Sequence, residues 1–157
     1  MANYLLKPVY ESIFGTSFRA GHFEDRMRMQ KCIYLLQDLG ISVGSYNFKW
    51  YKHGPYSQRL QNDILSLSTN ENISIKYSAD ARVAMDSLRN AIFQDNISYT
   101  TCQWTECLGS VHYIKDNLLP SSASENEILK ELESKKPHLN VLNDNERALY
   151  IVNTLFS

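Results

Sequence analysis

The apolar residues of this chain recur at helical spacing along much of its length. Between Glu24 and Leu39, steps of about 100° per residue bring the apolar side chains onto one stripe. This stripe consists of Met29, Cys32, Ile33, Leu36 and Leu39. Gly40 follows as a natural helix end. A second helix is predicted over residues 57–67, with its apolar stripe at Leu60, Ile64 and Leu67.

Between these two helices the period of the pattern changes from helical to two. Tyr46, Phe48 and Trp50 alternate with polar or half-polar neighbours, which predicts a half-buried strand from 46 to 52. The strand runs into Gly54 and Pro55, a pair that favours a turn because Gly accepts unusual backbone angles and Pro fixes φ.

The segment after the Gly-Pro pair predicts a helix start and then a second β element. Ser57 can cap the following helix, so Gly54, Pro55 and Ser57 together form a predicted structural turn. Ile73, Ile75 and Tyr77 alternate and predict a short strand or wing after that helix.

The C-terminal half, residues 80–157, predicts further helices. Asp80 is the expected cap of a helix that reaches Ile92, and a longer helix is expected from Thr100 to Leu118. Ser124 and Glu127 have the spacing of a capping box, and Pro137 should end the helix that follows it. A last helix is expected over 145–156.

These elements predict a mostly α-helical, compact domain with a small β element. The chain has 157 residues, of which 43% are hydrophobic, enough for one core and too few for two independent ones. We therefore expect one domain over 1–157, with a helix-strand-helix core at 24–77 and a helical half at 80–157. Residues 24–77 are compatible with a winged-helix-like arrangement.

Charge and cysteine content indicate which classes of partner and which cellular compartment to expect. The net charge of −1 gives no general reason to bind a polyanion or a membrane surface. Seven basic and three acidic residues between Arg19 and Arg59 give that segment +4, so the remainder sums to −5. No window approaches the ~20 apolar residues of a membrane span, and no signal-peptide pattern is seen. Three cysteines fit reduced thiols, so we expect a cytoplasmic protein.

No catalytic or metal-binding constellation is apparent from residue spacing. Cys102, Cys107 and His112 follow one another at five-residue steps, which rotate each side chain by about 140° on a helix. They therefore cannot converge on one ion, and Cys107 fits a small buried apolar side chain. His53 has no nucleophile or carboxylate at a motif spacing. We expect no enzyme activity, no cofactor and no metal.

One family resemblance rests on the segment from Glu24 to Leu67. The run Met29-Gln30-Lys31-Cys32-Ile33-Tyr34-Leu35-Leu36, the aromatic strand, and Tyr51-Lys52-His53-Gly54-Pro55-Tyr56-Ser57-Gln58-Arg59-Leu60 resemble the core of the SocA-like, or Panacea, antitoxin domain and its uncharacterised bacterial relatives. The resemblance implies a mostly helical, cytoplasmic bacterial protein that contacts other macromolecules, often in toxin-antitoxin or phage-defence settings. It implies no catalytic residues.

Two functions remain, and we favour a non-catalytic module that binds a partner protein, such as a toxin or a defence component. Tyrosine and arginine commonly anchor such interfaces. The expected interaction residues are Lys49, Tyr51, Lys52, His53, Tyr56, Gln58, Arg59 and Asn62. Homodimerisation stays open.

The alternative function is a winged-helix-like DNA-binding regulator. In it, helix 57–67 reads base edges through polar side chains such as Gln58 and Asn62. The phosphate contacts in this alternative are Arg26, Arg28 and Lys31. A dedicated DNA binder usually has a basic total as well as a basic patch, which is why we rank this function second.

Overall fold

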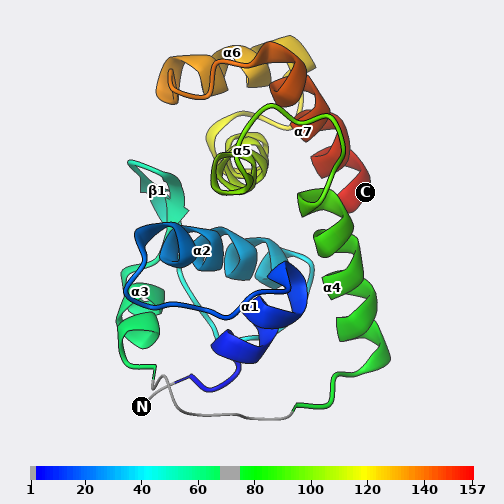
Figure 1. Ribbon diagram of the computed structural model, residues 1–157. Coiled ribbons are helices and arrows are strands. Elements are labelled where there is room, and N and C mark those ends of the chain that lie inside the picture. Colours follow the sequence, from blue (N-terminus) through cyan, green and yellow to red (C-terminus); the bar gives the residue numbers. More distant parts are fainter. Residues whose placement is uncertain (1–2, 68–74) are drawn as a thin grey trace.

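The computed structural model describes residues 3–67 and 75–157 and is mostly α-helical, as predicted (Figure 1). The helices in these residues are α1 (Leu6–Phe14), α2 (Phe23–Asp38), α3 (Gln58–Leu65), α4 (Ala79–Ile92), α5 (Thr101–Tyr113), α6 (Glu125–Lys135) and α7 (Leu142–Leu155). A π-helical turn, η1 (Ile114–Leu118), continues α5. The small β element is a hairpin of β1 (Lys49–Tyr51) and β2 (Gly54–Tyr56).

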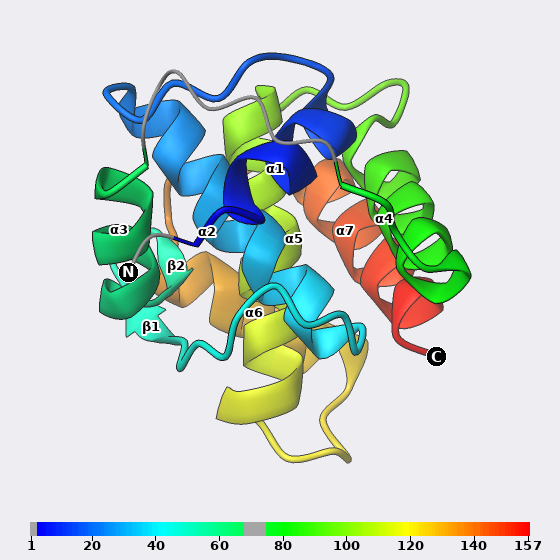
Figure 2. The same ribbon diagram turned by 90° about the horizontal axis from the view of Figure 1, so that it is seen from below.

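Helix α5 is the centre of the core. Figure 1 views it end-on, with α2 on one side, α6 on the other and α7 beside it, and Figure 2 shows α2 and α7 flanking it. Trp104, Leu108 and Val111 of α5 are almost fully buried. One hydrophobic cluster of buried residues takes side chains from all seven of these helices, as a single folding unit requires.

Most predicted helix starts are confirmed because capping is a local interaction. Ser57, Thr100 and Ser124 each accept a hydrogen bond from a backbone N–H in the first turn, and the last two form full capping boxes. The expected cap of α4 is corrected by the structure. Ser78 rather than Asp80 caps this helix, because Ser78 has an extended backbone and accepts from the Ala81 N–H.

The N-terminal helix α1 was not predicted. Leu6, Val9, Tyr10 and Ile13 have helical spacing and are buried, and α1 packs against α2 and α4. Pro8 is compatible with this helix because it lies in the first turn, where backbone N–H groups need no intrahelical partner.

The predicted strand 46–52 is shorter in the structure, where β1 covers only Lys49–Tyr51. The backbone N–H of Tyr46 donates to the side chain of Gln37 at 2.9 Å, and the Gln37 amide donates back to the Tyr46 carbonyl at 2.8 Å. Because α2 thus occupies both groups, regular pairing begins only at Lys49.

The wing expected over Ile73–Tyr77 is not formed by the part that the structure describes. Residues 75–78 have no regular secondary structure, and Ile73 lies outside the described residues. The hairpin instead precedes α3 in the chain. None of the described helices combines the length and apolar character needed to cross a membrane.

Candidate functional site

The hairpin and the start of α3 form the candidate site, and Gly54 determines how closely the hairpin approaches α5. Residues 52 and 53 form the turn, whereas Gly54 and Pro55 lie in β2, paired with Tyr51 and Trp50. The predicted Gly-Pro turn is therefore wrong in position. The φ of Gly54 is 87°, a backbone angle that favours glycine. A Cβ atom at Gly54 would lie 2.5 Å from Ser110 Oγ of α5.

Lys31 lies beneath the hairpin, in the interior of the protein. Its side chain is 1% exposed, runs along Gly109 of α5, and donates from Nζ to the Pro55 carbonyl at 2.8 Å. Burial lowers the pKa of Lys31 to about 7, and the nearby Glu106 partly opposes that effect. The expectation that Lys31 contacts phosphate is corrected, because this ammonium group is not on the surface.

Gln30 and Ser57 join α2 to the start of α3. The Gln30 amide donates to the Ser57 carbonyl, and its oxygen accepts from the Ser57 N–H, both at 2.9 Å. The Ser57 hydroxyl meanwhile accepts from the Leu60 N–H. All three residues are buried, so the orientation of α3 relative to α2 is tightly constrained.

Glu106 of α5 brings together two histidines that are far apart in sequence. His138 Nε2 lies 2.7 Å from one carboxylate oxygen of Glu106, and His53 Nδ1 lies 3.8 Å from the other. Burial lowers the pKa of His53, and the Glu106 carboxylate opposes the shift. The cluster therefore connects the hairpin turn with α5 and with the segment after α6.

Lys136 attaches the C-terminal half to the same turn. Its Nζ donates to the carbonyls of Tyr51, at 2.8 Å, and Lys52. The ammonium group also lies 4.8 Å from the centre of the Trp50 ring, within the range of a cation–π interaction. The hairpin is thus held from three sides, by α2, α5 and Lys136.

A groove of about 270 Å³ lies between the hairpin and residues of α2 and α3. It is lined by Phe23, Arg26, Met27, Tyr51, Lys52, His53, Tyr56 and Gln61. Phe23 and Tyr51 are each 49% exposed, although they are large aromatic residues. The Phe23 ring packs edge-on against His53 at 5.2 Å, and Tyr51 does the same against Tyr56 at 5.2 Å. We refer to this feature as the aromatic groove.

The structure gathers some of the predicted site residues at this groove and separates others. Tyr51, Lys52, His53 and Tyr56 line it, as does Arg26. The remaining interaction residues are exposed outside the groove lining; they are Lys49, Gln58, Arg59 and Asn62.

Arg28 is largely taken up by contacts inside the protein. Its guanidinium donates to Asp25 at 2.6 Å and to the Tyr10 hydroxyl at 3.0 Å, and its side chain is only 15% exposed. The expectation that Arg28 contacts phosphate is therefore corrected. This arginine instead holds α1 against α2.

Sequence reasoning did not find Phe23, Met27, Glu106, Lys136 or His138. Phe23 precedes the predicted helix stripe, and the last three belong to a half of the chain in which no motif was recognised. The packing of α5 against β2, the bond of Lys136 to the hairpin turn and the contact of His138 with Glu106 bring these last three residues to the site.

The two cysteines of α5 face different neighbours. Cys107 is buried and lies 3.4 Å from Asn145 of α7, whereas Cys102 lies 3.9 Å from the Glu24 carbonyl of α2. The prediction that Cys107 is a small buried side chain is confirmed.

Comparisons with protein-family models, with curated proteins and with solved structures find no match for this chain. The resemblance to the SocA-like antitoxin domain consequently rests on residues 24–67 and stays a prediction.

Proposed function

We propose that the protein is a non-catalytic interaction module that binds a partner protein through the aromatic groove. The observation that carries this proposal is the exposure of two large aromatic residues, Phe23 and Tyr51, in the lining of one concave surface. Aromatic and arginine side chains that cluster in a pocket commonly anchor protein interfaces. Four residues that sequence analysis singled out for interaction lie in this one surface.

The support beneath the groove favours binding without large rearrangement. Lys31 and Gln30 of α2, and Lys136 at the end of α6, each bond to backbone atoms of the hairpin or of the α3 start. A contact surface that is already ordered loses less conformational entropy when a partner binds.

The chemistry of the groove indicates what the partner would present. Arg26 and Lys52 place cationic groups at a surface whose walls are aromatic. A segment of the partner that combines an apolar or aromatic side chain with carboxylates would complement both. By the resemblance noted above, that partner is a toxin or a phage-defence component in the bacterial cytoplasm.

The test compares two double variants that remove the same side-chain types. Tyr51→Ala/Lys52→Ala alters the aromatic groove, whereas Tyr150→Ala/Lys130→Ala alters exposed residues of α7 and α6. Both should melt close to the wild type, since exposed substitutions change stability by only about 0.5 kcal/mol each. A protein captured from a bacterial lysate by the wild type should be retained by the control and lost by the groove variant. Equal retention by both would contradict the proposal.

The DNA-binding alternative is favoured by one observation, the exposed polar face of α3. Gln58, Arg59 and Asn62 are exposed on this helix, and Gln58 donates to Asn62 at 3.0 Å. Titration with mixed duplex DNA across a salt series separates this alternative from protein binding. Affinity that falls steeply with salt, with a slope of about 0.9 per phosphate contact, would favour it.

A further inference from the structure

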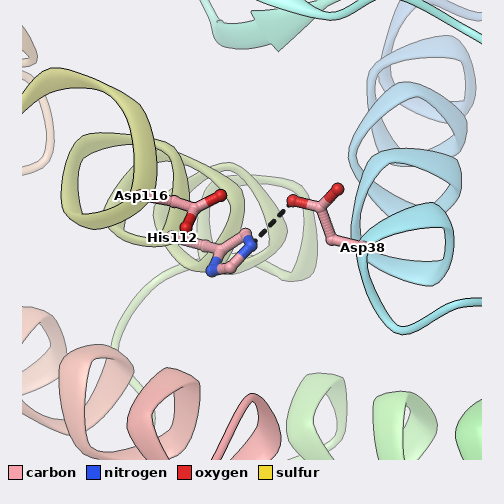
Figure 3. A group of neighbouring side chains, drawn as sticks. All are labelled: Asp38, His112 and Asp116. Carbon is pink, nitrogen blue, oxygen red and sulfur yellow. Dashed lines mark hydrogen bonds and ion pairs between the residues drawn. The ribbon is translucent and has the colours of Figure 1, made fainter.

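A second cluster of polar side chains lies at the opposite end of α2 from Phe23, between α2 and α5. Asp38 is the last residue of α2, His112 belongs to α5, and Asp116 belongs to η1 (Figure 3). One potential ligand atom from each residue lies within 4.8 Å of the other two. His112 Nε2 and Asp38 Oδ2 are 2.8 Å apart.

The local structure holds these side chains in position. Asp116 follows His112 by four residues, which puts both on one side of the helix. The bond from the Leu119 N–H to the Ile114 carbonyl, at 3.0 Å, closes the wider π-helical turn that carries Asp116. The His112 ring stacks on Phe156 with centroids 3.7 Å apart and an angle of 11°. The imidazole is therefore fixed before any ligand arrives.

Tyr34 supplies an independent observation at the same place. It is 3% exposed, its ring lies 5.6 Å from that of His112, and its hydroxyl has no hydrogen-bond partner among the described residues. Burial raises the pKa of Tyr34, and the carboxylates of Asp38 and Asp116 add to the shift because the hydroxyl lies near Asp38, although it does not reach hydrogen-bonding geometry there. A buried hydroxyl without a partner is costly, and a water molecule on a bound ion would give it one.

An ion pair alone does not account for the cluster. The contact between Asp38 and His112 could exist as a simple bond between α2 and α5. Such a bond needs neither a second carboxylate at Asp116, which repels the first, nor an unpartnered hydroxyl at Tyr34. A cation between the three side chains explains all four residues.

We propose that Asp38, His112 and Asp116 bind one divalent first-row transition-metal ion of the Zn²⁺ or Mn²⁺ type. One imidazole nitrogen and two carboxylate oxygens suit such ions, whereas Mg²⁺ and Ca²⁺ prefer oxygen ligands throughout. Ligand atoms at about 2.0–2.2 Å from one ion in tetrahedral geometry lie about 3.4 Å apart, so the 2.8 Å contact between His112 and Asp38 would lengthen by about half an ångström when the ion binds. The remaining coordination positions face solvent, because the Asp38 side chain is 30% exposed.

Calorimetric titration of the whole, chelator-treated protein with ZnCl₂, MnCl₂ and MgCl₂ tests this site. We expect one Zn²⁺ or Mn²⁺ ion per chain, with much weaker binding of Mg²⁺, and a melting temperature that rises with the bound ion. Asp116→Asn should weaken binding at least about tenfold, the smallest effect expected when a group supporting a metal is removed. Asp86→Asn, which changes an exposed carboxylate of α4, is the matched control and should bind as the wild type does.

Replacement of the ion by Co²⁺ identifies the ligands directly. The proposed site has no sulfur ligand, so the Co²⁺ spectrum should lack thiolate charge-transfer absorption. Thiolate absorption, or Zn²⁺ binding that is equal in the wild type and Asp116→Asn, would assign the ion to another place such as Cys102 and would overturn the proposal. Absence of Zn²⁺ and Mn²⁺ binding at millimolar concentration would overturn it as well. Should Asp116→Asn melt poorly without metal, Asp38→Asn provides the same comparison.

Discussion

Gly54 lies where the backbone of the hairpin and the side chain of Ser110 leave no room for a Cβ atom. Its φ of 87° is strained for any residue with a side chain, and the nearest atom to an added Cβ is the Ser110 hydroxyl oxygen at 2.5 Å. That hydroxyl is buried and makes no hydrogen bond among the described residues. Backbone strain and a side-chain collision therefore act at the same position.

Substitution of both residues separates these two effects. We expect Gly54→Ala to lower the free energy of unfolding by about 1–3 kcal/mol from backbone strain alone, with a further loss from the collision. Ser110→Ala by itself should be neutral or slightly stabilising, because it removes a buried hydroxyl without a partner. Denaturant unfolding should show that Gly54→Ala lowers the free energy of unfolding less in the Ser110→Ala background than in the wild-type background. An unchanged stability of Gly54→Ala would contradict the strained geometry.

At the scale of elements, the placement of α3 depends on one side chain of α2. Gln30 satisfies both the N–H and the carbonyl of Ser57, the residue between β2 and α3. Among the described residues, these two backbone atoms have one further protein partner, the Gln61 N–H, which donates to the Ser57 carbonyl within the helix. The junction is buried, so water does not replace the amide easily.

Gln30→Met should therefore destabilise the protein by about 1–3 kcal/mol, the cost of one buried unsatisfied group. The reason is that the buried Ser57 N–H loses its partner, whereas the Ser57 carbonyl keeps the bond from the Gln61 N–H. Gln58→Met is the control, since the Gln58 amide is exposed and bonds only to Asn62. Chemical denaturation measures both. Similar stabilities for the two variants would show that α3 does not depend on the Gln30 bonds.

At the scale of the whole molecule, the buried Lys31 links the stability of the fold to pH. It lies where α2, the hairpin and α5 meet, and burial lowers its pKa from 10.5 to about 7, with Glu106 acting against that shift and Lys136 adding to it. Between these pKa values the unfolded chain binds more protons than the folded chain. The stability contributed at this position therefore rises as the pH increases through that range.

Comparison of the wild type with Lys31→Met isolates this effect. From about pH 7 towards pH 9, the unfolding free energy of the wild type should increase relative to that of Lys31→Met, by at most about 1.4 kcal/mol per pH unit. The difference removes the contribution of other groups, such as Cys32 and Cys107, whose pKa values are raised by burial. Parallel pH profiles, measured by urea unfolding, would contradict a lowered pKa at Lys31.

The sequence by itself determined the helical class and most of the helix boundaries of this protein. Apolar spacing near 3.6 residues marks α2, α3 and α5, and the caps at Ser57, Thr100 and Ser124 act within four residues of themselves. Such interactions are local, so they can be read without knowledge of the rest of the chain. The aromatic alternation before Gly54 also indicated the β element, although not its length.

Only the tertiary structure decided where the functional candidates lie and which charges are available. The sequence indicated a surface cation at Lys31, whereas in the fold its side chain is buried against Gly109. Glu106 contacts both His53 and His138, which are 85 residues apart in the chain. Asp38 and His112 likewise meet across 74 residues. The physical reason is that burial, pKa and ion pairing depend on neighbours contributed by other elements, and periodicity along the chain contains no information about those neighbours.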